Sequence, residues 1–236
     1  MQLSKTENWA YEELKKNNLF LFRIRDLCLL LKINKMKAYN IVKSLKKKRA
    51  IESIGKGNLV FKGINEFVVA TRLNHPSYVS FWSALNYYGL SDQMPQKIFL
   101  ATTKYSREIN SFKYITLSKK RYFGYVSIGE IVIADKEKTI IDSLLFPKYS
   151  GGIAEINECL KNTLRDLDIN KLIKYAFLVD SKVVLRRLGF MLETLNCDKK
   201  LLKNIAKKIG KGYELLDPSL KKKNNLNSKW LLDVNI

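Results

Sequence analysis

NKMKAYNIVKSLKKKR, residues 34–49, is the segment that decides the fold of the first part of this chain. On a helix with about 100° between neighbours, one stripe is apolar and consists of Ala38, Ile41, Val42 and Leu45. The opposite stripe consists of Met36, Asn40, Lys43 and Lys47. We therefore expect a helix that packs through one face and presents a polar, cationic face on the other side.

Three short elements precede this helix. They are an amphipathic helix over Thr6–Lys16, a β-like run over Leu19–Phe22 and a second helix over Ile24–Lys32. The turn between the second helix and the basic helix is Ile33-Asn34. Asn34 is suited to cap the basic helix, because its side-chain oxygen can accept a backbone N–H of the first turn.

Two strand-like runs follow the basic helix, at Ala50–Ile54 and Leu59–Phe61. Gly55-Lys56-Gly57-Asn58 joins them and is rich in residues that tolerate positive φ, which predicts a hairpin. A helix that follows a tight turn after another helix is the arrangement that enters the DNA major groove. The order of elements predicts a winged helix-turn-helix domain over residues 1–62, with the hairpin as its wing.

The candidates for DNA contact come from the exposed side of this domain. On the recognition helix they are Lys35, Lys37, Tyr39, Asn40, Lys43 and Lys47. An asparagine amide can form two hydrogen bonds with an adenine edge, and lysine suits guanine or phosphate. We expect Arg25 and Lys56 to bind the DNA backbone on either side of this helix.

The charge of the chain favours a polyanionic partner. Its 236 residues carry 43 Lys or Arg and 22 Asp or Glu, a formal charge of +21. Residues 1–62 hold 15 basic and 5 acidic residues, whereas residues 63–150 hold 11 and 7 and residues 151–236 hold 17 and 10. A general lysine bias, the alternative explanation, would spread evenly, so this concentration indicates a nucleic-acid surface in the first part of the chain.

The composition changes after Lys62, and we place a domain boundary between Gly63 and Leu73. We expect residues 70–236 to form a larger mixed α+β domain with a helical C-terminal half, so that the protein is α+β overall. YVSFWSALNYYGL, residues 78–90, is interpreted as one helix, and Tyr122–Ile128 as a strand. Of the adjacent Arg186 and Arg187, we expect one to pair with a carboxylate and the other to meet solvent.

Residue types that hold metals or carry catalysis are sparse. Cys28, Cys159 and Cys197 are far apart, and His75 is the single histidine, so we expect no metal site, no cofactor and no catalytic residue. Asp135, Glu137 and Lys138 have the residue types of a nuclease site, but their contiguity favours the capped start of a helix. No signal peptide or long apolar run is present, which predicts a cytoplasmic protein without a membrane partner.

Several further motifs occur in a characteristic order. They are Ala84-Leu85, Tyr88-Gly89-Leu90, Glu137-Lys138-Thr139-Ile140-Ile141-Asp142, Pro147, Tyr149-Ser150-Gly151-Gly152, Leu185-Arg186-Arg187-Leu188-Gly189, Trp230 and Asn235. Together with the N-terminal domain, they make nearly the whole chain resemble the AbiE-type antitoxins, transcriptional regulators of type IV toxin–antitoxin systems in viral defence. The resemblance implies that the first domain represses its own promoter. It also implies that the second domain counteracts a nucleotidyltransferase-like toxin without a stable complex.

Two alternatives from other classes remain open at the level of sequence. One is a nuclease or nucleotidyltransferase in the second domain that a winged helix targets to its substrate, which requires carboxylates converging in a cleft. The other is a protein-docking adaptor without a nucleic-acid role. A second basic region, Lys199–Lys211 with Lys221–Lys223, is either a solvated face or a further phosphate-contacting surface.

Overall fold

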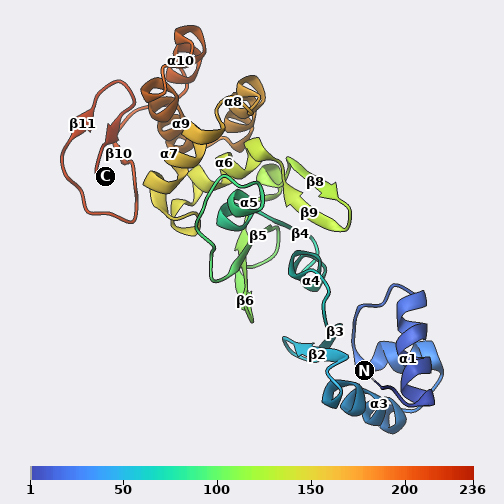
Figure 1. The fold of residues 1–236 in the computed structure, drawn as a ribbon. Helices are drawn as coiled ribbons and strands as arrows, with labels where there is room; N and C mark the ends of the chain where they lie inside the picture. The colour runs from blue at the N-terminus through green and yellow to red at the C-terminus, as the bar shows by residue number, and fades with distance from the viewer. Residues whose placement is uncertain (1) are drawn as a thin grey trace. The chain divides into compact units, whose positions relative to one another are not determined.

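The computed structural model describes residues 2–236, which form ten α-helices and three β-sheets (Figure 1). The predicted α+β class is therefore confirmed. The chain divides into two compact units. The N-terminal unit runs to His75 and includes Glu108–Ser111, and the C-terminal unit contains Pro76–Arg107 and Phe112–Ile236. None of the helices described between residues 2 and 236 combines the length and apolarity that crossing a membrane requires.

The N-terminal unit consists of helices and one small sheet. Its elements are α1 (Lys5–Lys16), β1 (Leu21–Phe22), α2 (Ile24–Leu31), α3 (Lys35–Lys47), β2 (Ile51–Ile54), β3 (Asn58–Phe61) and α4 (Glu66–Leu73). The three strands form one antiparallel sheet in the order β1-β3-β2. In β2 and β3, Ile51 pairs with Phe61 and Ile54 with Asn58, so the turn consists of residues 55–57.

Local sequence explains where these elements begin and turn. The hydroxyl of Ser4 accepts the Glu7 backbone N–H, and the Glu7 carboxylate accepts the Ser4 N–H at 2.6 Å, which closes a capping box on α1. The side chain of Asn34 caps α3 by accepting the Lys37 N–H at 2.9 Å, as predicted. Gly55 and Gly57 adopt φ of 57° and 74°, a region that side chains disfavour, and thereby reverse the chain between β2 and β3.

The short helix α4 is an element that the sequence analysis missed. Its residues lie in the segment that we interpreted as a boundary, yet Val68, Val69 and Ala70 are buried. Asn65 caps the helix by accepting the Phe67 N–H at 2.8 Å. The two compact units divide just after α4, between His75 and Pro76.

The C-terminal unit is built around strands β7, β5, β4, β9 and β8 of a six-stranded mixed sheet, whose full order is β6-β7-β5-β4-β9-β8. The strands of this sheet are β4 (Ser77–Val79), β5 (Ile98–Thr102), β6 (Arg107–Ile109), β7 (Phe112–Thr116), β8 (Tyr125–Ile128) and β9 (Ile131–Ala134). Two of the three residues of β6, Glu108 and Ile109, belong to the N-terminal unit. The helices are α5 (Phe81–Tyr87), α6 (Lys136–Leu145), α7 (Gly152–Thr163), α8 (Ile169–Val179), α9 (Lys182–Thr194) and α10 (Lys199–Ala206). A small sheet of β10 (Glu214–Leu215), β12 (Leu232–Asp233) and β11 (Leu226–Asn227) lies near the C-terminus (Figure 1).

Two predicted elements of this unit differ from the structure. The helix predicted over 78–90 begins only at Phe81, because Tyr78 and Val79 belong to β4 and are completely buried. A short apolar run in a central strand has no periodicity that distinguishes it from the start of a helix. The strand predicted over Tyr122–Ile128 begins at Tyr125, after a 3₁₀ turn at Lys119–Arg121.

The prediction for Arg186 and Arg187 is wrong, since both side chains are buried and neither meets solvent. Arg186 donates to the carbonyls of residues 209 and 211 at 3.0 and 2.8 Å. Arg187 donates to the carbonyls of residues 144, 215 and 216 at 2.7 to 3.2 Å. A guanidinium has five N–H donors, so it can satisfy the backbone of an irregular segment without a carboxylate partner.

Candidate nucleic-acid interface

Helix α3 has the two faces that its periodicity predicted. The apolar stripe, Ala38, Ile41, Val42 and Leu45, is buried against the rest of the N-terminal unit. The helix packs on α1, α2 and β2 through this stripe. Burial of a large aliphatic side chain contributes roughly 1.5–3 kcal/mol, so three of these residues hold the helix firmly in place. The opposite side is therefore presented as a rigid surface.

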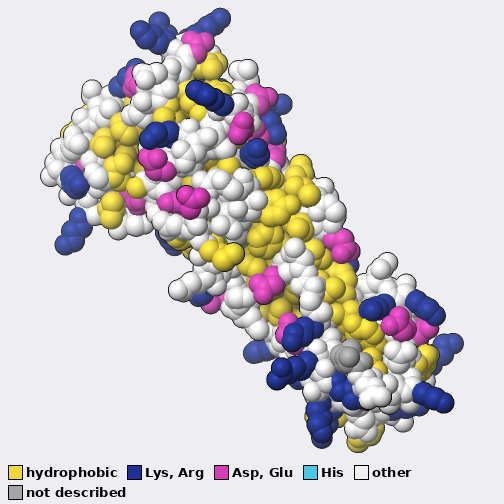
Figure 2. Space-filling view, viewed as in Figure 1, with side chains coloured by type: hydrophobic (Ala, Val, Ile, Leu, Met, Phe, Trp, Pro, Cys, Tyr) yellow, Lys and Arg dark blue, Asp and Glu magenta, His cyan; other side chains and the backbone are white. Residues whose placement is uncertain are grey.

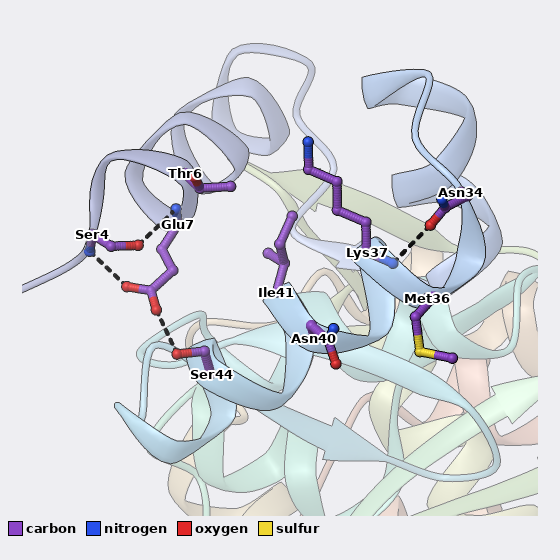
Figure 3. Close-up of a pocket in the computed structure, with 9 residues that line it drawn as sticks. All are labelled: Ser4, Thr6, Glu7, Asn34, Met36, Lys37, Asn40, Ile41 and Ser44. Carbon is purple, nitrogen blue, oxygen red and sulfur yellow. Dashed lines mark hydrogen bonds between the residues drawn. The ribbon is translucent and has the colours of Figure 1, made fainter.

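A buried carboxylate fixes the second half of α3 to α1. Glu7 accepts a hydrogen bond from the Lys48 ammonium at 2.5 Å. It accepts another from the Ser44 hydroxyl, which Figure 3 shows. The Lys48 ammonium, together with the Ser44 and Ser4 donors, lowers the pKa of Glu7 from 4.5 to about 2. Glu7 is thus charged at neutral pH, and its charge is compensated by Lys48.

All eight predicted contact residues lie in the N-terminal unit and are exposed. Lys35, Lys37, Tyr39, Asn40, Lys43 and Lys47 are on α3, Arg25 is on α2 and Lys56 is in the β2–β3 turn. Within residues 2–236, the lysines of this set form no ion pair, and the Asn40 amide has no hydrogen-bond partner. These groups are available to a ligand.

A groove lies on each side of the exposed face of α3. The first has a volume of about 430 Å³ and lies between α3 and the start of α1, with Lys37, Asn40, Ser4 and Thr6 among its lining residues (Figure 3). The second has a volume of about 260 Å³ and lies between α3 and the β2–β3 hairpin. Its lining residues include Ile24, Tyr39, Lys43, Lys46 and Leu59. The exposed face of α3 therefore forms a ridge between two grooves.

Three residues on or beside this ridge were not among the predicted contact residues. Lys46 donates to the Ser53 hydroxyl at 2.8 Å and so connects α3 to the hairpin. The Arg23 guanidinium donates to the Asn58 side-chain oxygen at 3.0 Å, next to the turn. Met36 lies on the ridge with 70% of its surface exposed. The helical period already placed Met36 on the polar stripe, but the two hydrogen bonds depend on tertiary structure.

Helix α3 itself contains no acidic residue, and β2, which packs against it, carries one exposed carboxylate, that of Glu52. Glu7 is compensated by Lys48, while Glu12 and Glu13 lie within 3.8 and 3.3 Å of lysines on α1. Asp26 accepts the Arg23 backbone N–H at 2.8 Å. Figure 2 shows lysine and arginine side chains gathered over α3 and the β2–β3 hairpin. The ridge is therefore a surface of positive potential.

In the C-terminal unit, Asp135 and Glu137 both contact Lys171, whereas Lys138 is directed elsewhere, so the three residues do not form one site. Asp135 caps α6, as predicted, and Lys171 lies 3.2 Å from its carboxylate and 2.8 Å from that of Glu137. Lys138 instead forms a completely buried ion pair with Asp142. Among residues 2–236, no group of three or more His, Cys, Asp and Glu side chains is arranged to hold a metal ion.

Comparison with solved structures reveals a likeness over nearly the whole chain. The chain is similar in structure to the Rv2827c protein from Mycobacterium tuberculosis, with a TM-score of 0.71 at 12% sequence identity. The match covers 98% of this chain and 92% of the other. That likeness establishes a shared fold. No protein-family model and no curated protein sequence matches this chain.

Proposed function

We propose that this protein is a DNA-binding transcriptional regulator rather than an enzyme, and that its N-terminal unit is a winged helix-turn-helix domain. Helix α3 is the recognition helix and the β2–β3 hairpin is the wing. The ligand is double-stranded DNA from the protein's own promoter.

One observation carries the proposal: α3 is anchored by a completely apolar stripe and exposes lysines without a single acidic residue. A helix whose exposed face projects as a positively charged ridge has the shape and charge that fit the DNA major groove. Arg25 and Lys56, on either side of α3 in sequence, are the candidates for contacts with the phosphate backbone.

The role of the C-terminal unit rests on the resemblance to AbiE-type antitoxins. We propose that this unit counteracts a nucleotidyltransferase-like toxin encoded beside it, by a route that does not need a stable complex. The protein is then the autorepressing antitoxin of such a pair.

A mobility-shift titration tests the DNA-binding proposal. The full chain should retard a duplex from upstream of its own gene in the presence of excess unrelated DNA. It should bind unrelated duplexes more weakly. Equal affinity for both duplexes would remove the autorepression proposal, and no retardation of either at low salt would remove DNA binding.

Growth rescue tests the antitoxin proposal separately. Cells that express the neighbouring nucleotidyltransferase-like gene receive the full chain from an unrelated promoter, so that repression cannot affect survival. A variant with Lys35, Lys43 and Lys47 replaced by glutamate serves as the matched control. We expect both proteins to rescue growth, whereas rescue by neither would leave a regulator without antitoxin activity.

A further inference from the structure

The first half of α3 has an uncharged centre between two lysines. Measured around the helix axis from Lys35, Tyr39 lies at about 40°, Met36 at about 100° and Asn40 at about 140°. Lys37 lies further round, at about 200°, on the side of the groove shared with α1. In this first half of α3, three uncharged side chains therefore occupy the middle of the ridge, in the part of a recognition helix that contacts base edges.

Two of these three side chains are apolar and unusually exposed. Met36 is 70% exposed and Tyr39 is 54% exposed, whereas the apolar residues Ile41, Val42 and Leu45 of the same helix are buried. Figure 3 shows Met36 and Asn40 on the same side of α3, whereas Lys37 and Ile41 extend from the side that faces α1. Met36 is thus not part of the core, and its methyl and thioether are available to a ligand.

The residue types present on α3, and those absent from it, favour contacts with some bases over others. Arginine, which recognises guanine through two hydrogen bonds, is absent from the helix, and so are the carboxylates that accept from cytosine. A lysine can reach guanine, but in the first half of α3 Lys35 and Lys37 flank the central positions. Lys43 and Lys47 share the central stripe only one and two turns beyond Asn40. Asparagine fits the N6 and N7 atoms of adenine, and apolar side chains fit the C5 methyl group of thymine. The central chemistry therefore matches A·T pairs.

We propose that Met36 and Tyr39 contact thymine methyl groups while Asn40 binds the adenine edge, so that α3 selects A·T base pairs. This inference rests on the proposed function, because it assigns a base preference to the same DNA-binding face. Met36 becomes a specificity-determining residue, and the lysines supply affinity for phosphates at any sequence.

The test removes the thymine methyl without altering base pairing. The full chain first selects duplexes from a random library at moderate salt, and we expect A·T pairs to be enriched at the positions under α3. Deoxyuridine then replaces the thymines of the selected duplex. Burial of one methyl-sized group changes affinity by roughly fourfold, so each contacted thymine should lose about that factor.

Variants of the full chain show whether Met36 and Tyr39 cause this loss. The double variant Met36→Ala/Tyr39→Ala should bind the thymine and deoxyuridine duplexes equally, because it makes no methyl contact. Lys56→Ala, a matched exposed substitution outside α3, should bind both duplexes more weakly and keep the full difference between them.

Each result has a distinct meaning. Salt-dependent binding without A·T enrichment would overturn the inference and leave the proposed function intact. An equal deoxyuridine effect in wild type and the double variant would also overturn it, since DNA shape would then be the cause. Absence of duplex binding under all conditions would remove the proposed function itself.

Discussion

Replacing Lys43 and Lys47 with alanine should make DNA binding less sensitive to salt. The proposed interface contains six exposed cationic side chains, which are Arg25, Lys35, Lys37, Lys43, Lys47 and Lys56. Each cation that neutralises a phosphate adds about −0.9 to the slope of log affinity against log salt concentration. Six contacts give a slope of about −5, and removal of two should change it to about −3.6.

Fluorescence anisotropy with a labelled duplex, measured from about 50 to 200 mM salt, checks this expectation. At the wild-type slope, affinity should fall roughly 10³-fold over that range, and the double variant should lose roughly 10²-fold. Lys221→Ala/Lys222→Ala is the control, since it removes the same charge from the C-terminal unit. A wild-type slope near zero, or an equal change in both variants, would refute the reasoning.

Three further predictions concern single residues. Asn40→Ala should cost roughly 1–3 kcal/mol at one base position, whereas Lys56→Ala should weaken binding to all sequences alike, and competition with mutated duplexes separates the two effects. The Glu7 carboxylate, with a pKa of about 2 in the folded chain against 4.5 ordinarily, stabilises the fold above about pH 4.5. That stabilisation is lost as pH falls through 2, so Glu7→Gln should show a weaker acid dependence in urea unfolding; identical profiles would contradict this. Gly189→Ala should destabilise the C-terminal unit by roughly 1–3 kcal/mol, because a Cβ there would lie 2.0 Å from the Trp230 ring. An unchanged melting temperature would count against that packing.

The basic helix and the hairpin could be predicted because their signals are local. The four apolar residues of α3 recur at the helical period, and Asn34 marks its start by its capping chemistry. Gly55 and Gly57 mark the turn, since a reversal at positive φ favours glycine. The same helical period places Lys43 and Lys47 opposite the apolar stripe, where the structure finds them exposed.

Other features depend on contacts between distant segments, and local patterns do not encode them. The β4 strand is fully buried in the middle of its sheet, so its residues lack the alternation that identifies a strand. The Glu7–Lys48 pair joins residues 41 positions apart. Arg187 finds its acceptors on backbone carbonyls rather than on a side chain, and sequence patterns carry no signal for such acceptors.

Charge reversal on two basic helices tests the central claim most directly. One full-length variant carries Lys35→Glu/Lys43→Glu/Lys47→Glu on α3, and the other carries Lys199→Glu/Lys203→Glu/Lys207→Glu at α10. All six lysines are exposed, and the two changes in net charge are identical. If α3 is the DNA-binding surface, the first variant should lose duplex binding and the second should keep affinity close to wild type at moderate salt. Equal losses in both would show that overall charge, rather than α3, attracts DNA, and would contradict the proposed recognition helix.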